Sequence, residues 1–254
     1  MDPLKAAAAA GTGAVLLGGG GWGLSMALSN NSMPDYSPLD NPTGTYFTDN
    51  KDYFAAVNGN ENWWRWSYKN RWSVKKPTTG KFQNVTSGDG DSNSIKKVCE
   101  DAYTKGTSDI SATVEDNKYL ESEVWRFCSA VEEKPKTISE ATEEKKIYDA
   151  INNSYGKEKA SNLVAVTGND SFWLEQERLF FKEEKKSDRS GAKASKTGNS
   201  LFKDLFEKRN KTRGDKDTLR NACKEAYKSN KDESVEGNKV QEADVLKFCS
   251  VKGS

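Results

Sequence analysis

The chain has 254 residues, 30% of which are charged, and 39 Lys and Arg nearly balance 38 Asp and Glu. Because this balance supplies no overall field that would draw the protein onto a polyanion, we expect no nucleic acid as a partner. Histidine is absent, which excludes Ser-His and Cys-His nucleophile pairs and removes the commonest metal ligand. The composition predicts a well-solvated surface over two modest hydrophobic cores rather than one large core.

Residues 1–29 form an apolar N-terminal segment. Residues 6–28 carry no charged side chain, and their number suits a helix that crosses a bilayer. We therefore predict an N-terminal apolar helix that contacts the membrane through residues 6–28. Two alternatives are a signal segment cleaved at the small-x-small triplet 27–29, and a flexible Gly/Ala tail that enters no membrane. Lys5 alone is a weak positive-inside signal, so the sequence leaves the membrane orientation open.

Residues 30–50 follow as a Pro- and Asn-rich segment. Pro34, Pro38 and Pro42 lie among Asp, Asn, Ser and Gly, a composition that favours extended and turn conformations over helix. We expect this segment to be a linker that holds the folded part away from a membrane surface.

The rest of the chain contains an internal repeat, the feature to seek before any fold is assigned. Three pairs of segments align without gaps: 54–64 with 163–173, 95–103 with 219–227, and 123–129 with 244–250. In the first pair, Gly59 coincides with Gly168 and Trp64 with Trp173. Three matches in the same order indicate a tandem duplication.

The repeat defines the predicted domain organisation. We place a first helical module at residues 51–131 and a second at 161–254. The linker between them, 132–160, contains a helix over 137–152. The predicted fold class is therefore mainly α: an N-terminal apolar helix, then two tandem homologous small helical modules, each with a cysteine pair.

An aromatic block opens the first module. Trp64, Trp66, Tyr68 and Trp72 occupy even positions, the alternation of a half-buried strand. The matching segment of the second module, 172–182, lacks this alternation and is rich in helix formers. Because duplicated copies share a fold, we predict that both segments are helical.

The same block is a candidate contact patch. Its members are Trp63, Trp64, Trp66, Tyr68 and Trp72. No single helical face buries five such rings, so we expect core packing for most of them and an exposed contact patch for the others. Interleaved with Arg65, Lys69 and Arg71, they offer the alternative of a stacking platform for single-stranded nucleic acid or glycans.

The segment before the first cysteine resembles a calcium-binding loop. Asp89, Asp91, Asn93 and Glu100 occupy positions one, three, five and twelve of the pattern. Ser94 stands where the pattern requires glycine, and the second module lacks the pattern altogether. We therefore predict a turn followed by a helix cap at Asn93 or Ser94, and no metal.

Four cysteines lie in matched pairs, Cys99 with Cys128 and Cys223 with Cys249. Around each of them, apolar residues recur with helical spacing, so each pair lies on the inner faces of two amphipathic helices. Without histidine or a C-x-x-C motif, zinc is disfavoured. We expect one disulfide within each module, with buried free thiols as the alternative. Disulfides imply an oxidising, extracytoplasmic location.

Two further elements are predicted in the second module. Residues 182–200 consist almost wholly of Lys, Glu, Ser, Gly, Ala and Asp, which predicts a mobile loop because little apolar surface is available to order it. Residues 201–206 then begin a helix.

The start Met-Asp-Pro-Leu-Lys before a Gly/Ala-rich segment, and the repeated Lys-Lys-Val-Cys-Glu-Asp-Ala-Tyr and Val-Trp-Arg-Phe-Cys-Ser patterns, carry a resemblance. They resemble the large paralogous families of uncharacterised surface or membrane proteins in haemotropic mycoplasmas. The resemblance implies a surface antigen or a protein that contacts the host. It supplies no catalytic or binding residue, and the two cysteine modules here depart from the shorter members expected of such families.

We therefore expect a non-enzymatic, membrane-anchored surface protein without cofactors, whose two modules are extracytoplasmic. A cytoplasmic protein that binds single-stranded nucleic acid through the Trp/Arg block is one alternative. A hydrolase with an unrecognised carboxylate site is another. The sequence does not define the ligand or the oligomeric state.

Overall fold

The computed structural model describes residues 32–196, 200–231 and 240–252, and over these ranges the chain is mainly helical, as predicted. The predicted N-terminal membrane helix lies outside the described residues. Among the residues that are described, no helix combines the length and the apolar character needed to span a membrane.

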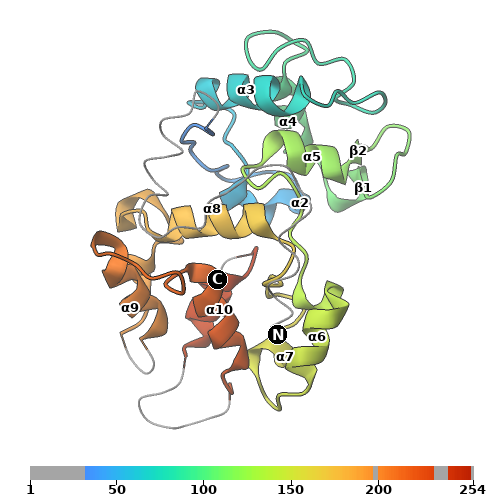
Figure 1. Cartoon of the computed structure of the whole chain (residues 1–254). Coiled ribbons are helices and arrows are strands. Elements are labelled where there is room, and N and C mark those ends of the chain that lie inside the picture. The colour runs from blue at the N-terminus through green and yellow to red at the C-terminus, as the bar shows by residue number, and fades with distance from the viewer. Residues whose placement is uncertain (1–31, 197–199, 232–239, 253–254) are drawn as a thin grey trace.

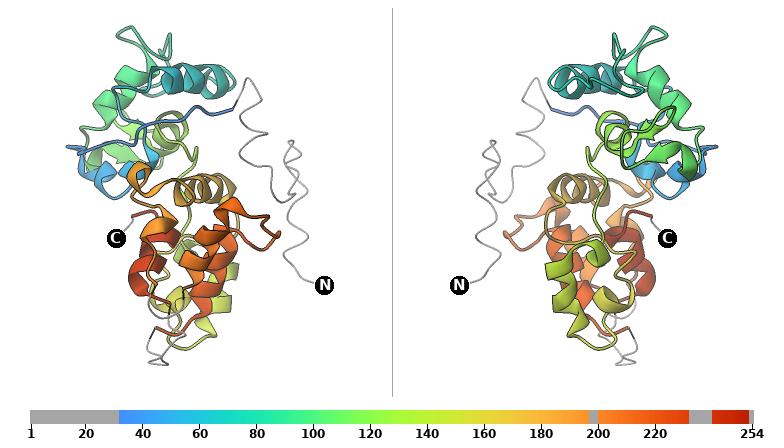
Figure 2. Two further views of the ribbon diagram at one scale, coloured as in Figure 1. Left: turned by 90° about the vertical axis from the view of Figure 1, so that its left-hand side faces the viewer. Right: turned by 90° about the vertical axis from the view of Figure 1, so that its right-hand side faces the viewer.

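The helices form two groups with one helix between them (Figure 1). The upper group contains α2 (Thr45–Thr48), α3 (Glu61–Ser67), α4 (Ile95–Ala102) and α5 (Glu121–Cys128), with a parallel pair of short strands, β1 (Ile110–Ser111) and β2 (Tyr119–Leu120). The lower group contains α6 (Thr142–Asp149), α7 (Tyr155–Glu158), α9 (Leu201–Glu207), α10 (Leu219–Lys228) and α11 (Glu242–Cys249). Helix α8 (Asp170–Phe180) lies between the groups, and the side views show the same division (Figure 2). We call residues 32–131 the first half and residues 132–252 the second half.

The two helices that carry the first cysteine of each pair form as their sequences predict. Ser94 Oγ accepts a hydrogen bond from Lys97 N at the start of α4, and Thr218 Oγ1 accepts one from Asn221 N at the start of α10. These caps satisfy amide groups that have no partner inside the helix. The apolar positions of both helices face inward, including the cysteine of each.

Both segments of the aromatic block are helical, which confirms the prediction made from the repeat. In the first half, α3 continues into a π-helical turn over Tyr68–Trp72. In the second half, α8 runs through the matching segment without a change of helix type. The alternation of rings in the first half therefore does not mark a strand.

Several contacts recur in the two halves. A buried tyrosine donates to two carbonyls in each, one in an extended segment and one at the second cysteine. The acceptors are Ala55 and Cys128 for Tyr103, and Val164 and Cys249 for Tyr227. Gly59 and Gly168 both adopt left-handed backbone angles, with φ of 78° and 76°, a conformation that favours glycine because a Cβ would be strained there.

An asparagine clamps an extended segment in each half. Asn60 Nδ2 donates to Ala56 O and Ser37 O, and its Oδ1 accepts from Ser37 N. Asn169 makes the same three bonds to Ala165 and Lys136. The clamped segment precedes the predicted start of the module in both halves.

The structure does not bear out the spacer predicted over residues 30–50, because the described residues 32–50 pack against the rest of the first half. Tyr36, Leu39 and Phe47 are buried in the core of the first half, and Pro38 pairs with Ala55 in an antiparallel bridge. Proline and asparagine favour extended chain, as expected, but the extended chain is held against the body by backbone hydrogen bonds.

The expectation of two separate cores also differs from the structure, because the buried apolar side chains of the described residues form one connected cluster. Helix α8 connects the halves. The rings of Tyr53 and Phe172 lie 5.5 Å apart, and Tyr53 Oη donates to Gln176 Oε1 at 2.6 Å. Tyr36 Oη donates to Glu175 Oε1 at 2.9 Å. Buried polar residues on α8 thus tie the two halves together.

The prediction of a mobile loop over 182–200 is wrong for residues 182–196, which contain two 3-10 turns, Glu184–Lys186 and Gly191–Lys193, and which contact α8, α9 and α11. Arg189 is only 2% exposed, and each of its three guanidinium nitrogens donates a hydrogen bond. A Cβ on Gly191 would lie 2.5 Å from the ring of Phe180. The hydrogen bonds of a buried arginine and the close packing of a glycine against a ring therefore hold this segment in place, although it has few large apolar side chains.

Candidate functional site: disulfide centres and exposed surface

The first disulfide joins Cys99 on α4 to Cys128 at the end of α5, with a Cα–Cα distance of 5.8 Å. The second joins Cys223 on α10 to Cys249 at the end of α11, with a Cα–Cα distance of 5.7 Å. All four cysteines are fully buried. The predicted pairing within each half is confirmed, and no cysteine is left as a free thiol.

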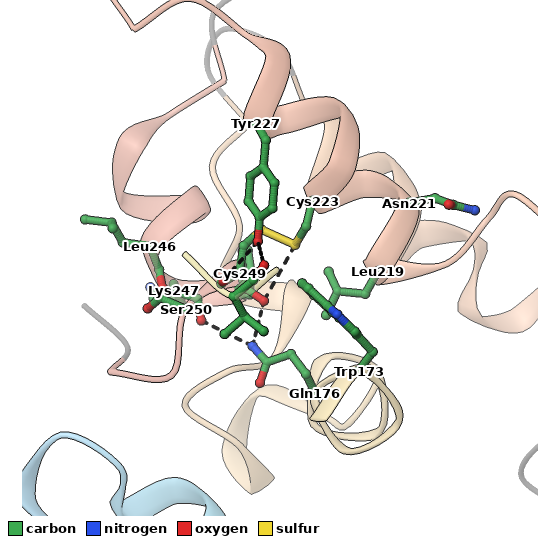
Figure 3. Close-up of a disulfide and its surroundings, with 12 residues drawn as sticks. Trp173, Gln176, Leu219, Asn221, Cys223, Tyr227, Leu246, Lys247, Cys249 and Ser250 are labelled. Carbon is green, nitrogen blue, oxygen red and sulfur yellow. Dashed lines mark hydrogen bonds between the residues drawn. A yellow bond between two sulfur atoms is a disulfide. The ribbon is translucent and has the colours of Figure 1, made fainter. Parts of the chain in front are cut away.

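Polar side chains from two helices surround the second disulfide (Figure 3). Tyr227 on α10 donates to Cys249 O at 3.1 Å, and Gln176 on α8 donates to Phe248 O at 2.8 Å. These carbonyls belong to the last turn of α11, where the helix itself provides no amide partner. Burial raises the pKa of the Tyr227 hydroxyl well above its ordinary value, so this donor keeps its proton at physiological pH.

A buried arginine caps the helix that ends at the second cysteine of each half. Arg71 donates to the carbonyl of Arg126 in the last turn of α5 and to those of Ser129 and Ala130 just after it. Arg189 donates to the carbonyl of Lys247 in the last turn of α11 and to those of Ser250 and Val251 just after it. Each guanidinium also contacts a carboxylate, since Arg71 Nε lies 3.0 Å from Glu132 Oε1 and Arg189 Nε lies 2.7 Å from Asp52 Oδ2. A cation at a helix C-terminus is favoured by the helix dipole.

Sequence reasoning missed these two arginines because they do not align. Arg71 lies seven positions after Trp64, where the matching position of the second half is Phe180. Arg189 comes from the segment predicted to be mobile. The sequence offers only a weak indication of the capping role of Arg189: it is a single arginine beside Ser190 and Gly191 in a segment otherwise rich in lysine and glutamate.

The candidate contact patch is mostly interior. Trp63 and Trp64 are fully buried and Trp72 is 5% exposed, whereas Trp66 and Tyr68 are half-buried. One ring face of each of the last two is covered from within the chain. The guanidinium of Arg71 lies 4.7 Å from the ring centroid of Trp66, and the Tyr68 ring stacks on Trp72 with centroids 5.1 Å apart.

The residues of the calcium-like pattern form a turn. Asp91 accepts from Ser87 Oγ and from Asn93 N, which is how an aspartate closes a turn on itself. Asp89 instead pairs with Lys96 at 3.2 Å. Within the described residues, no group of three His, Cys, Asp or Glu side chains is placed to hold a metal ion.

A shallow cavity of about 320 Å³ lies at the junction of the halves, beside Tyr36, Asp52 and Arg189. Three of its basic side chains form ion pairs: Lys182 with Asp35, Arg189 with Asp52, and Lys193 with Asp188. The first two of these pairs join the two halves.

The carboxylate of Glu123 on α5 has a raised pKa and lacks a hydrogen bond at one oxygen. Burial raises the pKa of Glu123 to about 7, and its Oε2 has no hydrogen-bond partner. Its aligned counterpart, Asp244 on α11, also has a raised pKa because of burial, but it accepts a bond from Ser195 N at 2.9 Å. The packed segment 182–196 thus satisfies one of the two carboxylates.

Comparisons with known proteins found no matching family model, no similar curated protein and no similar solved structure. Functional assignment therefore depends on the residues and contacts of this chain.

Proposed function

We propose that this chain is a non-enzymatic surface protein, anchored by its N-terminal segment, whose folded part lies outside the cytoplasm and serves in host contact or as an antigen. The observation that carries the proposal is the pair of disulfides, one in each half and both buried between helices. Such bonds form and persist in oxidising compartments. The resemblance to surface or membrane proteins of haemotropic mycoplasmas supports the same location.

We further propose that the halves are tandem homologous modules. The recurring tyrosine, asparagine and glycine contacts, which fall at aligned positions, support a common origin. We place the start of each module further toward the N-terminus, because Asn60 and Asn169 hydrogen-bond to Ser37 and Lys136. A protein built this way has a framework held by disulfides and buried polar bonds, and exposed loops whose sequence is free to vary.

The alternatives drawn from the sequence have less support. Stacking of nucleic-acid bases needs exposed aromatic faces, and one face of Trp66 is covered by Arg71 and one face of Tyr68 by Trp72. A hydrolase needs convergent titratable groups in a cavity, and Lys182, Arg189 and Lys193 of the cavity at the junction are already engaged in ion pairs with carboxylates.

The test is protease treatment of intact cells, followed by peptide mapping of the protein with and without reductant. The proposal predicts loss of peptides from residues 32–252 on external proteolysis. It also predicts linked peptides that contain Cys99 with Cys128 and Cys223 with Cys249. Reduced cysteines in a chain that external protease does not touch would show that the location is wrong.

A further inference from the structure

A basic surface lies on the first half, in the segment that runs through the π-helical turn. Residues 62–88 contain six Lys and Arg and no Asp or Glu, although the whole chain has a net charge of only +1. Four of the six are exposed lysines, which we call the basic patch: Lys69, Lys75, Lys76 and Lys81. Among the described residues, no carboxylate forms an ion pair with any of the four, whereas the neighbouring Lys96 and Lys105 are both paired.

Contacts of Trp72 place two of these lysines, Lys76 and Lys81, near one indole ring. Lys76 Nζ lies 5.1 Å from the ring centroid of Trp72. Trp72 Nε1 donates to Phe82 O at 2.8 Å, which brings the chain next to Lys81 back onto the same indole ring. The ring is 5% exposed, so it is a buried support rather than a contact surface. Helix α3 and the segment that follows it lie at the end of the molecule opposite α6, α7 and α9 (Figure 1).

The chemistry of this surface limits its partner. Exposed large apolar side chains are few among the described residues: Val74, Val114, Ile147 and Leu174. Only Val74 belongs to the basic segment, so the surface lacks the apolar residues that insert into a lipid layer. Trp72 covers one face of Tyr68 and Arg71 covers one face of Trp66, which leaves less aromatic surface for stacking of nucleic-acid bases. A surface that binds its partner through lysine charges alone is suited to a linear polyanion.

The second half does not share this surface. Its corresponding stretch, residues 171–197, holds seven Lys and Arg together with five Asp and Glu, and several of them pair with each other, as Lys186 does with Glu183 and Lys193 with Asp188. The two halves therefore have similar frameworks but differ in local charge, and the difference is concentrated in one segment.

We propose that the basic patch binds a linear sulfated polysaccharide, with the lysine ammonium groups of Lys69, Lys75, Lys76 and Lys81 contacting successive sulfates. The choice of a polysaccharide over a nucleic acid rests in part on the extracytoplasmic location proposed above. Binding of this kind releases counterions from the polymer, so it weakens steeply as salt rises, and each lost contact lowers the salt dependence.

The test measures binding of the purified full chain to heparin at several salt concentrations. The test variant replaces Lys75, Lys76 and Lys81 by Ala. The matched control replaces three exposed lysines of the second half by Ala, which removes the same charge: Lys185, Lys186 and Lys196. All six side chains are exposed, so the circular dichroism spectrum is expected to match that of the wild type.

We expect the test variant to bind heparin at least about tenfold more weakly near 0.1 M salt, and the slope of log K against log salt to fall in magnitude by roughly two. The control variant keeps most of the affinity. Equal loss in both variants, or no binding by the wild type, would overturn the proposal. Tighter binding of single-stranded DNA than of heparin would overturn the choice of polysaccharide. Because heparin binding is measured on purified protein, its failure is distinguishable from failure of the location test on intact cells.

Discussion

Removal of the Arg189 side chain is expected to destabilise the fold strongly. The guanidinium is 2% exposed, and it donates to the carbonyls of Lys247, Ser250 and Val251 while contacting Asp52 at 2.7 Å. Arg189→Ala leaves one buried carbonyl and one partly buried carboxylate without a partner, while water reaches the other two carbonyls.

The expected size of the loss follows from these contacts. Breaking a buried ion pair by removing one partner costs about 3 to 5 kcal/mol, and a hydrogen bond to a charged group contributes about 1.5 to 3 kcal/mol. Because Asp52 keeps partial access to water, with 24% of its side chain exposed, we expect the low end, about 3 kcal/mol. Arg189→Lys is expected to recover only part of this loss, because an ammonium group cannot reach several carbonyls in the planar geometry of a guanidinium.

The assay is urea unfolding under non-reducing conditions, with the free energy of unfolding taken from the midpoint and slope. Lys193→Ala is the control, because its partner Asp188 is 88% exposed and an exposed ion pair contributes at most about 1 kcal/mol. If Arg189→Ala lowered the free energy of unfolding by less than about 1 kcal/mol, the helix-capping role assigned to this arginine would be refuted.

Three further predictions concern stability. Replacing Cys223 and Cys249 together by Ser is expected to cost about 3 to 4 kcal/mol by the loop-entropy relation for their separation of 26 residues. The same urea assay measures it, and an unchanged midpoint would contradict it. Burial raises the pKa of Glu123 from 4.5 to about 7, so the folded state favours the protonated form and loses stability as pH rises through this interval. Glu123→Gln is therefore expected to stabilise the half-exposed site by about 1 kcal/mol at pH 8 and by nothing at pH 4, and an equal effect at both pH values would rule out this cause. Gly191→Ala forces a Cβ to within 2.5 Å of a phenylalanine ring and is expected to cost about 1 to 3 kcal/mol, whereas Gly214→Ala, whose Cβ meets nothing closer than 3.6 Å, is expected to change thermal stability little.

The local elements of this protein were predictable because the repeat presents each pattern twice. Apolar spacing and a polar cap define α4 and α10 in both halves. The alternating rings of residues 64–72 favour a strand when they are read alone, and only the comparison with α8 corrects this interpretation. The disulfide pairing follows from the same logic, since each pair lies on neighbouring amphipathic helices.

Other features depend on contacts between residues far apart in the chain. Periodicity does not reveal that residues 182–196 are ordered, because the energy comes from one arginine whose acceptors lie about 60 residues away. For the same reason the composition of the proline-rich segment predicts a spacer, whereas residues 32–50 are ordered by hydrogen bonds to Asn60 and by the packing of Phe47.

The sequence by itself determined the helical character, the helix caps and the cysteine pairs, because these depend on residues a few positions apart or on an internal repeat. Only the tertiary structure decided that the two halves share one core through α8, and that two arginines from unaligned positions perform the same capping task. It also decided that the ring of Trp72 lies beside Lys76 of the basic patch. The physical reason is that an unpaired carbonyl is satisfied by whichever donor the fold brings within reach, wherever that donor lies in the chain.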